Sequence, residues 1–271
     1  MLSFKLPGSI FIFILLLLIT IPAISFTPIE NDGLSQKHVD SVSGPKTPLN
    51  KQATQFVKKY IKENDECLEM IKQNRSASFE LIDGIFTKYE LPVELKYLAV
   101  VESELNTKAV SRVGAAGPWQ FMPATAKYLG LKITRKYDER KNLKKSTNAA
   151  ALYLRDLYRQ YGDWLLVLAA YNCGPGPVNS AIRKSGSRNF WKLQYHLPAE
   201  SRDHVKKFIA THYFFEGKGS ATTLTKAENI KYAQELSIWA ANQSKANTTP
   251  LAVMENNQPT DSISRKTVVL N

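Results

Sequence analysis

The chain has 271 residues, of which 44% are hydrophobic and 10% aromatic, a composition that supports a folded core and excludes a wholly disordered protein. Its formal net charge of +12 predicts an acidic partner, such as an anionic lipid, a nucleic acid or an acidic cell-wall polymer. The 2 cysteines and 4 histidines lack the spacing of a metal site, so we expect neither a metalloenzyme nor any other cofactor.

The N-terminus has the pattern of an export signal. Lys5 precedes an apolar run over residues 10–21, and small residues follow Pro22 at the two positions that a signal peptidase reads. We predict a cleaved signal peptide over residues 1–25. The alternative is an uncleaved anchor, for which the run is short against the roughly 20 residues of a membrane span. Export places the chain in the periplasm or cell envelope of a Gram-negative-type bacterium and argues against a nucleic-acid partner.

Composition and periodicity divide the rest of the chain. Residues 26–50 are rich in Ser, Pro, Gly and Asn and are expected to form a flexible linker. Residues 51–217 show helical periodicity without a strand-rich stretch, which predicts one mainly α domain, with residues 111–121 as a loop or short ribbon. Residues 218–271 are expected to form a tail, with one more helix over 226–243 and disorder after it.

Capping residues and helix breakers predict where the helices begin and end. Proline in a first turn and glycine just after a last turn are the main signals. The expected segments are a helix from residue 50 onward, one around 81–89, one over 92–105, one from Pro123 to Gly130, one over 146–161, one over 164–172, one between a tight connection at 174–177 and Gly186, and one from Pro198.

Two glutamates follow an apolar run in the stretch LAVVESELN. In a helix over 92–105, Glu102 shares a face with Leu98, whereas Glu104 lies about 200° further round the helix. Burial and the negative end of a helix both favour the protonated carboxyl group, which is the form that a general acid needs. Glu102 is therefore the candidate acid, against the alternative of a surface glutamate at a frayed helix end, and Glu104 is expected at the surface.

An acid on an apolar helix face suits glycosidic bond cleavage, in which the leaving oxygen needs a proton. Most glycosidases add a second carboxylate as nucleophile or base. No second acid is favoured here, because Asp138, Asp156 and Asp163 lie in helix or cap contexts that explain them structurally. The residues therefore favour a mechanism with one acid, assisted by the substrate.

Three motifs, in order along the chain, carry a family resemblance. The stretch ESELNTKAVSRVGAAGPWQFMPATA resembles the catalytic segment of the lytic transglycosylases (SLT family) related to the goose-type lysozymes. The later stretches AAYNCGPGPV and LPAESRDHVKKFIA resemble the second and third motifs of that family, and the match covers about residues 75–215. The Trp-Gln pair and the third motif are most similar to the membrane-bound lytic murein transglycosylase D branch.

The resemblance implies a lysozyme-like helical fold with a cleft for the glycan strands of peptidoglycan. In that family a glutamic acid protonates the oxygen of a MurNAc-β-1,4-GlcNAc bond. The same residue then takes a proton from the MurNAc 6-hydroxyl, which closes onto C1 and forms a 1,6-anhydro sugar. The expected enzyme is thus a monomeric lyase acting on peptidoglycan, with weak association with a membrane or an anionic wall surface through its positive charge.

The resemblance also assigns roles residue by residue. Glu102 would be the acid and then the base, and Tyr171 would contact it through its hydroxyl, against the alternative of a core aromatic. The other implied substrate-binding residues are Ser111, Gln120, Met122 and Glu200. On the residues alone, Met122 would be core filler and Glu200 a first-turn acid favoured by the helix dipole.

Four small or amide residues of the motifs have expected backbone roles. Gly114 and Gly117 would let the backbone approach the substrate, and Asn106 and Asn172 would fix turns.

The chain departs from the family pattern at two positions. His204 stands where a tyrosine is common, and Cys173 follows the Tyr-Asn pair, where small residues are usual. Cys67 and Cys173 either pair in an oxidising compartment or stay as free thiols. The basic stretch over residues 132–145 is either a solvated face or a surface for an anionic wall polymer.

Two other functions are compatible with these patterns. A goose-type lysozyme-like muramidase would use the same fold and the same glutamate but would hydrolyse the bond. A non-catalytic wall-binding protein would keep the fold alone, and the presence of Glu102, Tyr171 and Gln120 argues against it.

Overall fold

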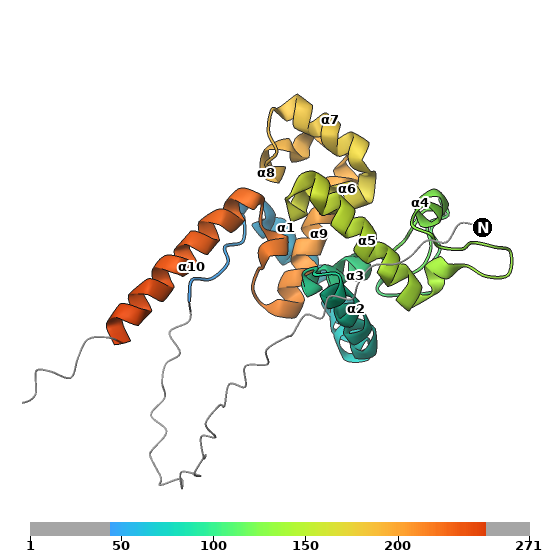
Figure 1. Cartoon of the computed structure of the whole chain (residues 1–271), viewed down its shortest axis with the longest axis horizontal. Coiled ribbons are helices and arrows are strands. Elements are labelled where there is room, and N and C mark those ends of the chain that lie inside the picture. Colours follow the sequence, from blue (N-terminus) through green and yellow to red (C-terminus); the bar gives the residue numbers. More distant parts are fainter. Residues whose placement is uncertain (1–43, 248–271) are drawn as a thin grey trace, which may run out of the picture. The chain divides into compact units, whose positions relative to one another are not determined.

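The computed structural model describes residues 44–247, with side chains as far as residue 244. The expected signal peptide over 1–25, most of the expected linker over 26–50 and the end of the expected tail lie outside the described residues. Figure 1 shows the described part as helices, with longer irregular stretches on both sides of α4, and the only β pairing in it consists of isolated bridges. No helix in this part is long and apolar enough to cross a membrane.

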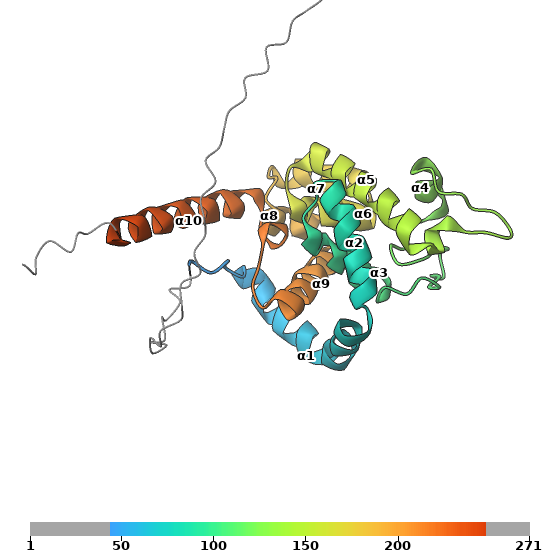
Figure 2. The same cartoon turned by 60° about the horizontal axis from the view of Figure 1, so that its bottom comes forward.

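The first two helices confirm the periodicity read from the sequence. Helix α1 (Lys51–Asn74) begins where the Asn50 side chain accepts a backbone N–H of the first turn. It packs along α9 (Ala199–Glu216), and the two helices lie side by side in Figures 1 and 2. Helix α2 (Ser76–Lys88) packs against α5 (Leu143–Tyr161).

The segment that carries Glu102 is shorter as an α-helix than the sequence predicts. The expected helix over 92–105 is a 3-10 turn, η1 (Val93–Lys96), followed by α3 (Tyr97–Ser103). The helix ends early because Glu104 takes a left-handed backbone conformation, with φ of 55°, and its N–H still bonds back into α3. Glu102 therefore lies in the last turn of α3.

A ribbon and two short helices follow α3. Isolated antiparallel bridges lie between residues 110 and 121, so the expected ribbon over 111–121 is confirmed. Helix α4 (Pro123–Tyr128) begins at its proline, as expected. The 3-10 turn η2 (Glu139–Lys141) leads into α5, which begins earlier than expected because Asn142 caps it.

The core is centred on α6 (Trp164–Cys173), whose residues 164–170 are all buried. Asp163 caps this helix by accepting two backbone N–H groups, as the sequence predicts. A helix that is apolar all round must be covered on every side, and α5, α7 (Pro175–Ser185) and α9 pack against it. Residues at the end of α6 are thus fixed by their neighbours.

The segment at 174–177 is the start of a helix and not a connection. Only Gly174, with φ of 80°, lies between α6 and α7, and Pro175 takes the first helical position. The expected connection is wrong because a first-turn proline lacks only an N–H that the helix does not use. Helix α8 (Phe190–Leu193) and η3 (Gln194–His196) then lead to α9.

The chain after α9 remains part of the packed structure. Residues 222–225, around η4 (Ala221–Thr223), are buried, and the Thr47 hydroxyl donates to the Gly219 carbonyl at 2.9 Å. Helix α10 (Lys226–Asn247) follows and is longer than the helix expected over 226–243.

The mainly α fold class is confirmed. The structure holds Cys67, on α1, and Cys173, at the end of α6, as free thiols. The alternative of a disulfide between them is therefore wrong for this structure.

Candidate active site

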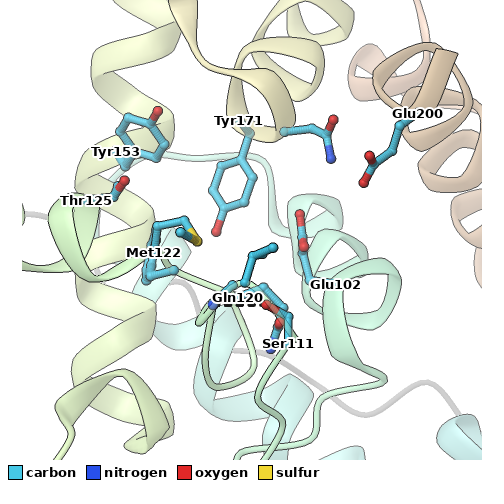
Figure 3. Close-up of a pocket in the computed structure, with 12 residues that line it drawn as sticks. Glu102, Ser111, Gln120, Met122, Thr125, Tyr153, Tyr171 and Glu200 are labelled. Carbon is cyan, nitrogen blue, oxygen red and sulfur yellow. Dashed lines mark hydrogen bonds between the residues drawn. The ribbon is translucent and has the colours of Figure 1, made fainter. Parts of the chain in front are cut away.

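A pocket of about 300 Å³ opens beside Glu102. The six residues for which the sequence predicts a role all line it: Glu102, Ser111, Gln120, Met122, Tyr171 and Glu200 (Figure 3). They come from the end of α3, the ribbon, the residue before α4, the end of α6 and the first turn of α9. The fold therefore gathers residues that are widely separated in the sequence around one acid.

Glu102 projects into the pocket from an apolar floor. Leu98 and Ala99, one turn earlier, are fully buried, whereas 14% of the Glu102 side chain is exposed. The helical face predicted from the sequence is thus confirmed, and the carboxyl group is held on a rigid element. Glu104 is exposed, as expected, and does not line this pocket.

The partner of the Glu102 carboxyl group is a residue whose role the sequence did not suggest. His204 on α9 places its Nε2 atom 2.9 Å from Oε1 of Glu102. Only 8% of the His204 side chain is exposed, so this contact lies beneath the pocket surface. The spacing of His204 from Phe208 and His212 does indicate the buried face of α9, but no local pattern predicts a contact across 102 residues.

The Tyr171 hydroxyl makes a different contact from the one expected. It donates to the Trp119 backbone carbonyl at 2.7 Å, and not to the carboxyl group of Glu102. Burial raises the pKa of Tyr171 well above its usual range, and the negative charge of Glu102 adds to this shift. The hydroxyl thus stays protonated and acts as a donor that ties the end of α6 to the ribbon.

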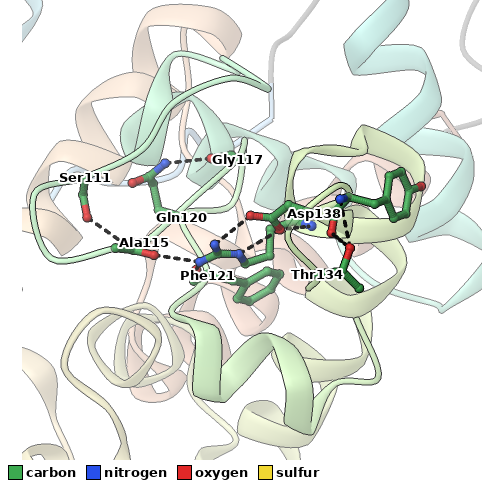
Figure 4. Close-up of polar contacts among 10 residues, drawn as sticks. Ser111, Ala115, Gly117, Gln120, Phe121, Thr134 and Asp138 are labelled. Atoms are coloured by element: carbon green, nitrogen blue, oxygen red, sulfur yellow. Dashed lines mark hydrogen bonds and ion pairs between the residues drawn. The ribbon is translucent and has the colours of Figure 1, made fainter. Parts of the chain in front are cut away.

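The ribbon presents Ser111 and Gln120 to the pocket in fixed positions. The Gln120 amide donates to the Gly117 carbonyl at 2.8 Å, and the Ser111 hydroxyl accepts the Ala115 backbone N–H at 3.0 Å (Figure 4). Gln120 also has a φ of 46°. A non-glycine residue persists in this region only where its surroundings hold it, and such residues are concentrated at ligand sites.

Arg140 fixes the ribbon from behind. Its guanidinium donates to the backbone carbonyls of Gly114 and Phe121 at 2.7 and 2.9 Å and pairs with Asp138 (Figure 4). The hydrogen bonds that Arg140 donates to Asp138 hold the pKa of the Asp138 carboxyl group below its usual range. The expectation of a basic face in contact with solvent is wrong for Arg140, which is 7% exposed, because the ribbon carbonyls need a buried donor.

Met122 and Glu200 lie at the open edge of the pocket. Met122 is 42% exposed, so it is not core filler. Glu200 is exposed in the first turn of α9, and Figure 3 shows its carboxyl group directed toward the space beside Glu102. Both side chains are accessible to a ligand.

Asn106 has the turn-fixing role expected of it, whereas Asn172 joins two helices and does not fix a turn. The Asn172 side chain accepts the Ser201 hydroxyl at 2.7 Å and so links α6 to α9. The Asn106 side chain accepts the Lys108 backbone N–H at 2.9 Å, which fixes the turn after α3.

A second pocket of about 300 Å³ reaches Glu102 from the side of α1. Its polar and polarisable lining residues are Tyr60, Asn64, Cys67, Ser103, Glu104 and Asn106. Glu102 therefore lies where two pockets meet, an arrangement that suits an extended ligand crossing the acid. The sequence did not predict that α1 contributes to this wall.

The chemistry that these side chains offer is proton transfer at Glu102. Within residues 44–247, no group of His, Cys, Asp and Glu side chains has the geometry to hold a metal ion.

Comparison with known proteins identifies the segment that supplies most of the first pocket's lining. Residues 82–194 match the family of the transglycosylase SLT domain. The chain contains a transglycosylase SLT domain. The family resemblance seen in the motifs is thereby confirmed. The SLT domain runs from α2 to η3, so it includes Glu102 and Tyr171, whereas α1 and α9 lie outside the matched residues.

Two lytic murein transglycosylases are among the proteins similar to this chain. Membrane-bound lytic murein transglycosylase D of Escherichia coli is 37% identical over 168 residues, which are 60% of this chain and 36% of that protein. The soluble lytic murein transglycosylase of Salmonella typhimurium is 30% identical over 140 residues, which are 47% of this chain and 22% of that protein. The chain thus spans little more than a third of the first relative and less of the second.

Solved structures give a similar neighbour. The 70 kDa soluble lytic transglycosylase of Escherichia coli has a TM-score of 0.46 and 28% identity, over 55% of this chain and 26% of that one.

Proposed function

We propose that the chain is a peptidoglycan lytic transglycosylase that cleaves MurNAc-β-1,4-GlcNAc bonds without water and leaves 1,6-anhydro-MurNAc ends. The observation that carries the proposal is the carboxyl group of Glu102, which is held at a helix end where two pockets meet. The names of the relatives, which are murein transglycosylases, support the same class of reaction.

In the first step, protonated Glu102 gives its proton to the glycosidic oxygen as the bond from that oxygen to C1 of MurNAc breaks. The N-acetyl carbonyl of the same sugar stabilises the positive charge at C1. Ser111, Gln120 and Met122 surround the pocket and are proposed to hold this sugar beside the acid.

In the second step, Glu102 acts as a base. Its carboxylate removes the proton of the MurNAc 6-hydroxyl, and O6 bonds to C1 to close the anhydro ring. Glu102 ends the cycle protonated, as it began, and no water is consumed. One carboxyl group is therefore sufficient for both proton transfers.

Glu200 is the observation that favours a second candidate. It is a second carboxyl group on the same pocket, and a glycosidase that uses two carboxylates would hydrolyse the bond. In the transglycosylase proposal Glu200 binds substrate, so Glu200→Gln keeps measurable activity. In a muramidase with Glu200 as base, Glu200→Gln is as damaging as Glu102→Gln.

Digestion of purified peptidoglycan followed by mass spectrometry tests the proposal. The expected products carry anhydro ends and are lighter by one water than hydrolysed muropeptides. Products with reducing ends alone would establish the muramidase instead. Equal digestion by wild type and Glu102→Gln would remove Glu102 from the mechanism and favour a non-catalytic wall-binding role.

The proposed location follows from the substrate. We infer export to the periplasm or cell envelope, with peptidoglycan glycan strands as the partner, and we keep the monomeric state as a prediction. The exposed lysines at positions 132, 136, 141 and 144 are proposed to add weak attraction to an anionic surface. Cell fractionation and salt-dependent binding to purified walls check the location and the attraction.

A further inference from the structure

We propose that His204 is a positioning residue that determines which oxygen of Glu102 carries the acid proton. This inference rests on the proposed function, because it concerns the same carboxyl group, and it adds a residue that lies outside the SLT domain match. His204 lines neither pocket, so it acts on the substrate only through Glu102.

The contact has the geometry of a strong and isolated hydrogen bond. Nε2 of His204 and Oε1 of Glu102 are 2.9 Å apart, and the two side chains are 8% and 14% exposed. At this depth water competes little for either atom. His204 belongs to the buried face of α9, on which Phe208, one turn later, is fully buried.

The second ring nitrogen indicates the protonation state of the imidazole. Nδ1 of His204 is buried and has no hydrogen-bond partner among the described residues. If Nδ1 carried a proton, as it does in imidazolium or in the other neutral tautomer, it would be a buried donor without an acceptor, which folded proteins rarely contain. The favoured state is therefore a neutral ring with its single proton on Nε2.

This state has a direct consequence for the acid. The Nε2–H group donates to Oε1, so Oε1 is the accepting oxygen and the acid proton is placed on Oε2. After the first step the carboxylate keeps the same hydrogen bond, and Oε2 takes the proton from the 6-hydroxyl. His204 keeps its own proton throughout. An imidazolium would instead hold Glu102 as a carboxylate, which has no proton to give.

The ionisable groups around the pair come from each helix that packs near it. In the first pocket the other ionisable groups are Tyr153 on α5, Tyr171 on α6 and Glu200 on α9. In the second they are Tyr60 and Cys67 on α1 and Glu104 after α3. Among these groups, only Glu102 is in hydrogen-bond contact with the imidazole.

Two substitutions separate positioning from packing. His204→Gln keeps a neutral N–H donor of similar reach, and His204→Phe keeps the ring volume but removes the donor. His196→Gln, at an exposed histidine outside both pockets, is the matched control. For digestion of purified peptidoglycan, we expect His204→Phe to lower kcat by roughly ten- to a hundredfold with KM within about twofold. His204→Gln should stay within about threefold of wild type and keep the same pH profile.

Several outcomes would overturn the inference. Equal loss in the Gln and Phe variants would show a structural role. Undiminished kcat in a folded His204→Phe would show that the contact is not used. An acid limb of the pH profile that is present in wild type and absent in His204→Gln would show that the imidazole titrates during the cycle.

A spectroscopic measurement keeps the inference testable if the Phe variant does not fold. In the full chain labelled with ¹⁵N-histidine, the His204 signals are assigned by their loss in His204→Gln. At the pH of the digestion assay we expect a neutral ring protonated on Nε2, and an imidazolium or a proton on Nδ1 would refute the inference. If wild type releases no anhydro products, the proposed function fails while this measurement still stands.

Discussion

Gly117→Ala tests how tightly Arg140 holds the ribbon that lines the pocket. Gly117 has a φ of 80°, and a methyl group there would lie 1.9 Å from the Arg140 carbonyl oxygen and 2.6 Å from its carbonyl carbon. An alanine in this left-handed conformation costs about 1–2 kcal/mol, and an extra carbon in a packed site costs about 1–3 kcal/mol. We expect the free energy of unfolding to fall by about 2–5 kcal/mol.

Gly114→Ala is the matched control, because Gly114 has a φ of 89° but nothing lies within 4 Å of the added carbon. It should lose only the backbone cost of about 1–2 kcal/mol. Equilibrium urea unfolding followed by tryptophan fluorescence measures both variants. Equal losses of stability in the two variants would refute the reasoning, because the contact between the added carbon and the Arg140 carbonyl would then have no energetic cost. At a temperature where both variants are folded, Gly117→Ala should also digest peptidoglycan more slowly, since Gln120 moves with the ribbon.

Three further predictions concern buried polar groups. Burial lowers the pKa of His212 from 6.5 to about 4, so the His212 imidazole binds a proton more tightly in the unfolded chain than in the folded one. Wild-type stability should fall by up to about 3 kcal/mol as the pH drops from about 6.5 to about 4, and His212→Gln should remove that slope from thermal melts. Thr147→Val leaves the buried Trp119 indole N–H, now 3.0 Å from the Thr147 hydroxyl, without an acceptor, so urea unfolding should show a loss of about 1–3 kcal/mol that Thr147→Ser avoids. Tyr171→Phe removes the donor to the Trp119 carbonyl and should cost about 0.5–1.5 kcal/mol of stability, with a smaller loss of digestion than Glu102→Gln; a total loss would mean that Tyr171 acts on the substrate directly.

Local signals were sufficient to predict much of the fold and the identity of the acid. Helical phase singles out Glu102, and the structure places it on both pockets, whereas Glu104 is exposed and lines only the second. The cap at Asp163 and the glycine after α5 were also predictable, because each depends on neighbours within a few residues.

Contacts between distant segments could not be predicted in the same way. The expected partner of Tyr171 was Glu102, but a backbone carbonyl at Trp119 accepts its hydroxyl. Arg140 belongs to a run of basic residues that resembles a solvated face, yet it is buried against carbonyls of the ribbon. Every residue has a backbone carbonyl, so the sequence does not show which carbonyl a side chain binds, and such side chains are easily misassigned.

The candidate site is completed by elements outside the matched domain. Residues 82–194 supply Glu102 and the ribbon, but α9 supplies both His204 and Glu200, and α1 forms one wall of the second pocket. Helix α9 also packs on α3 and α6, so without it the apolar faces behind the acid would be open to water. Burial of the acid and the hydrogen bond that orients it therefore have the same origin. A change in the packing of α9 should alter both stability and proton transfer. A change at Nε2 of His204 alone should alter proton transfer and leave stability unchanged.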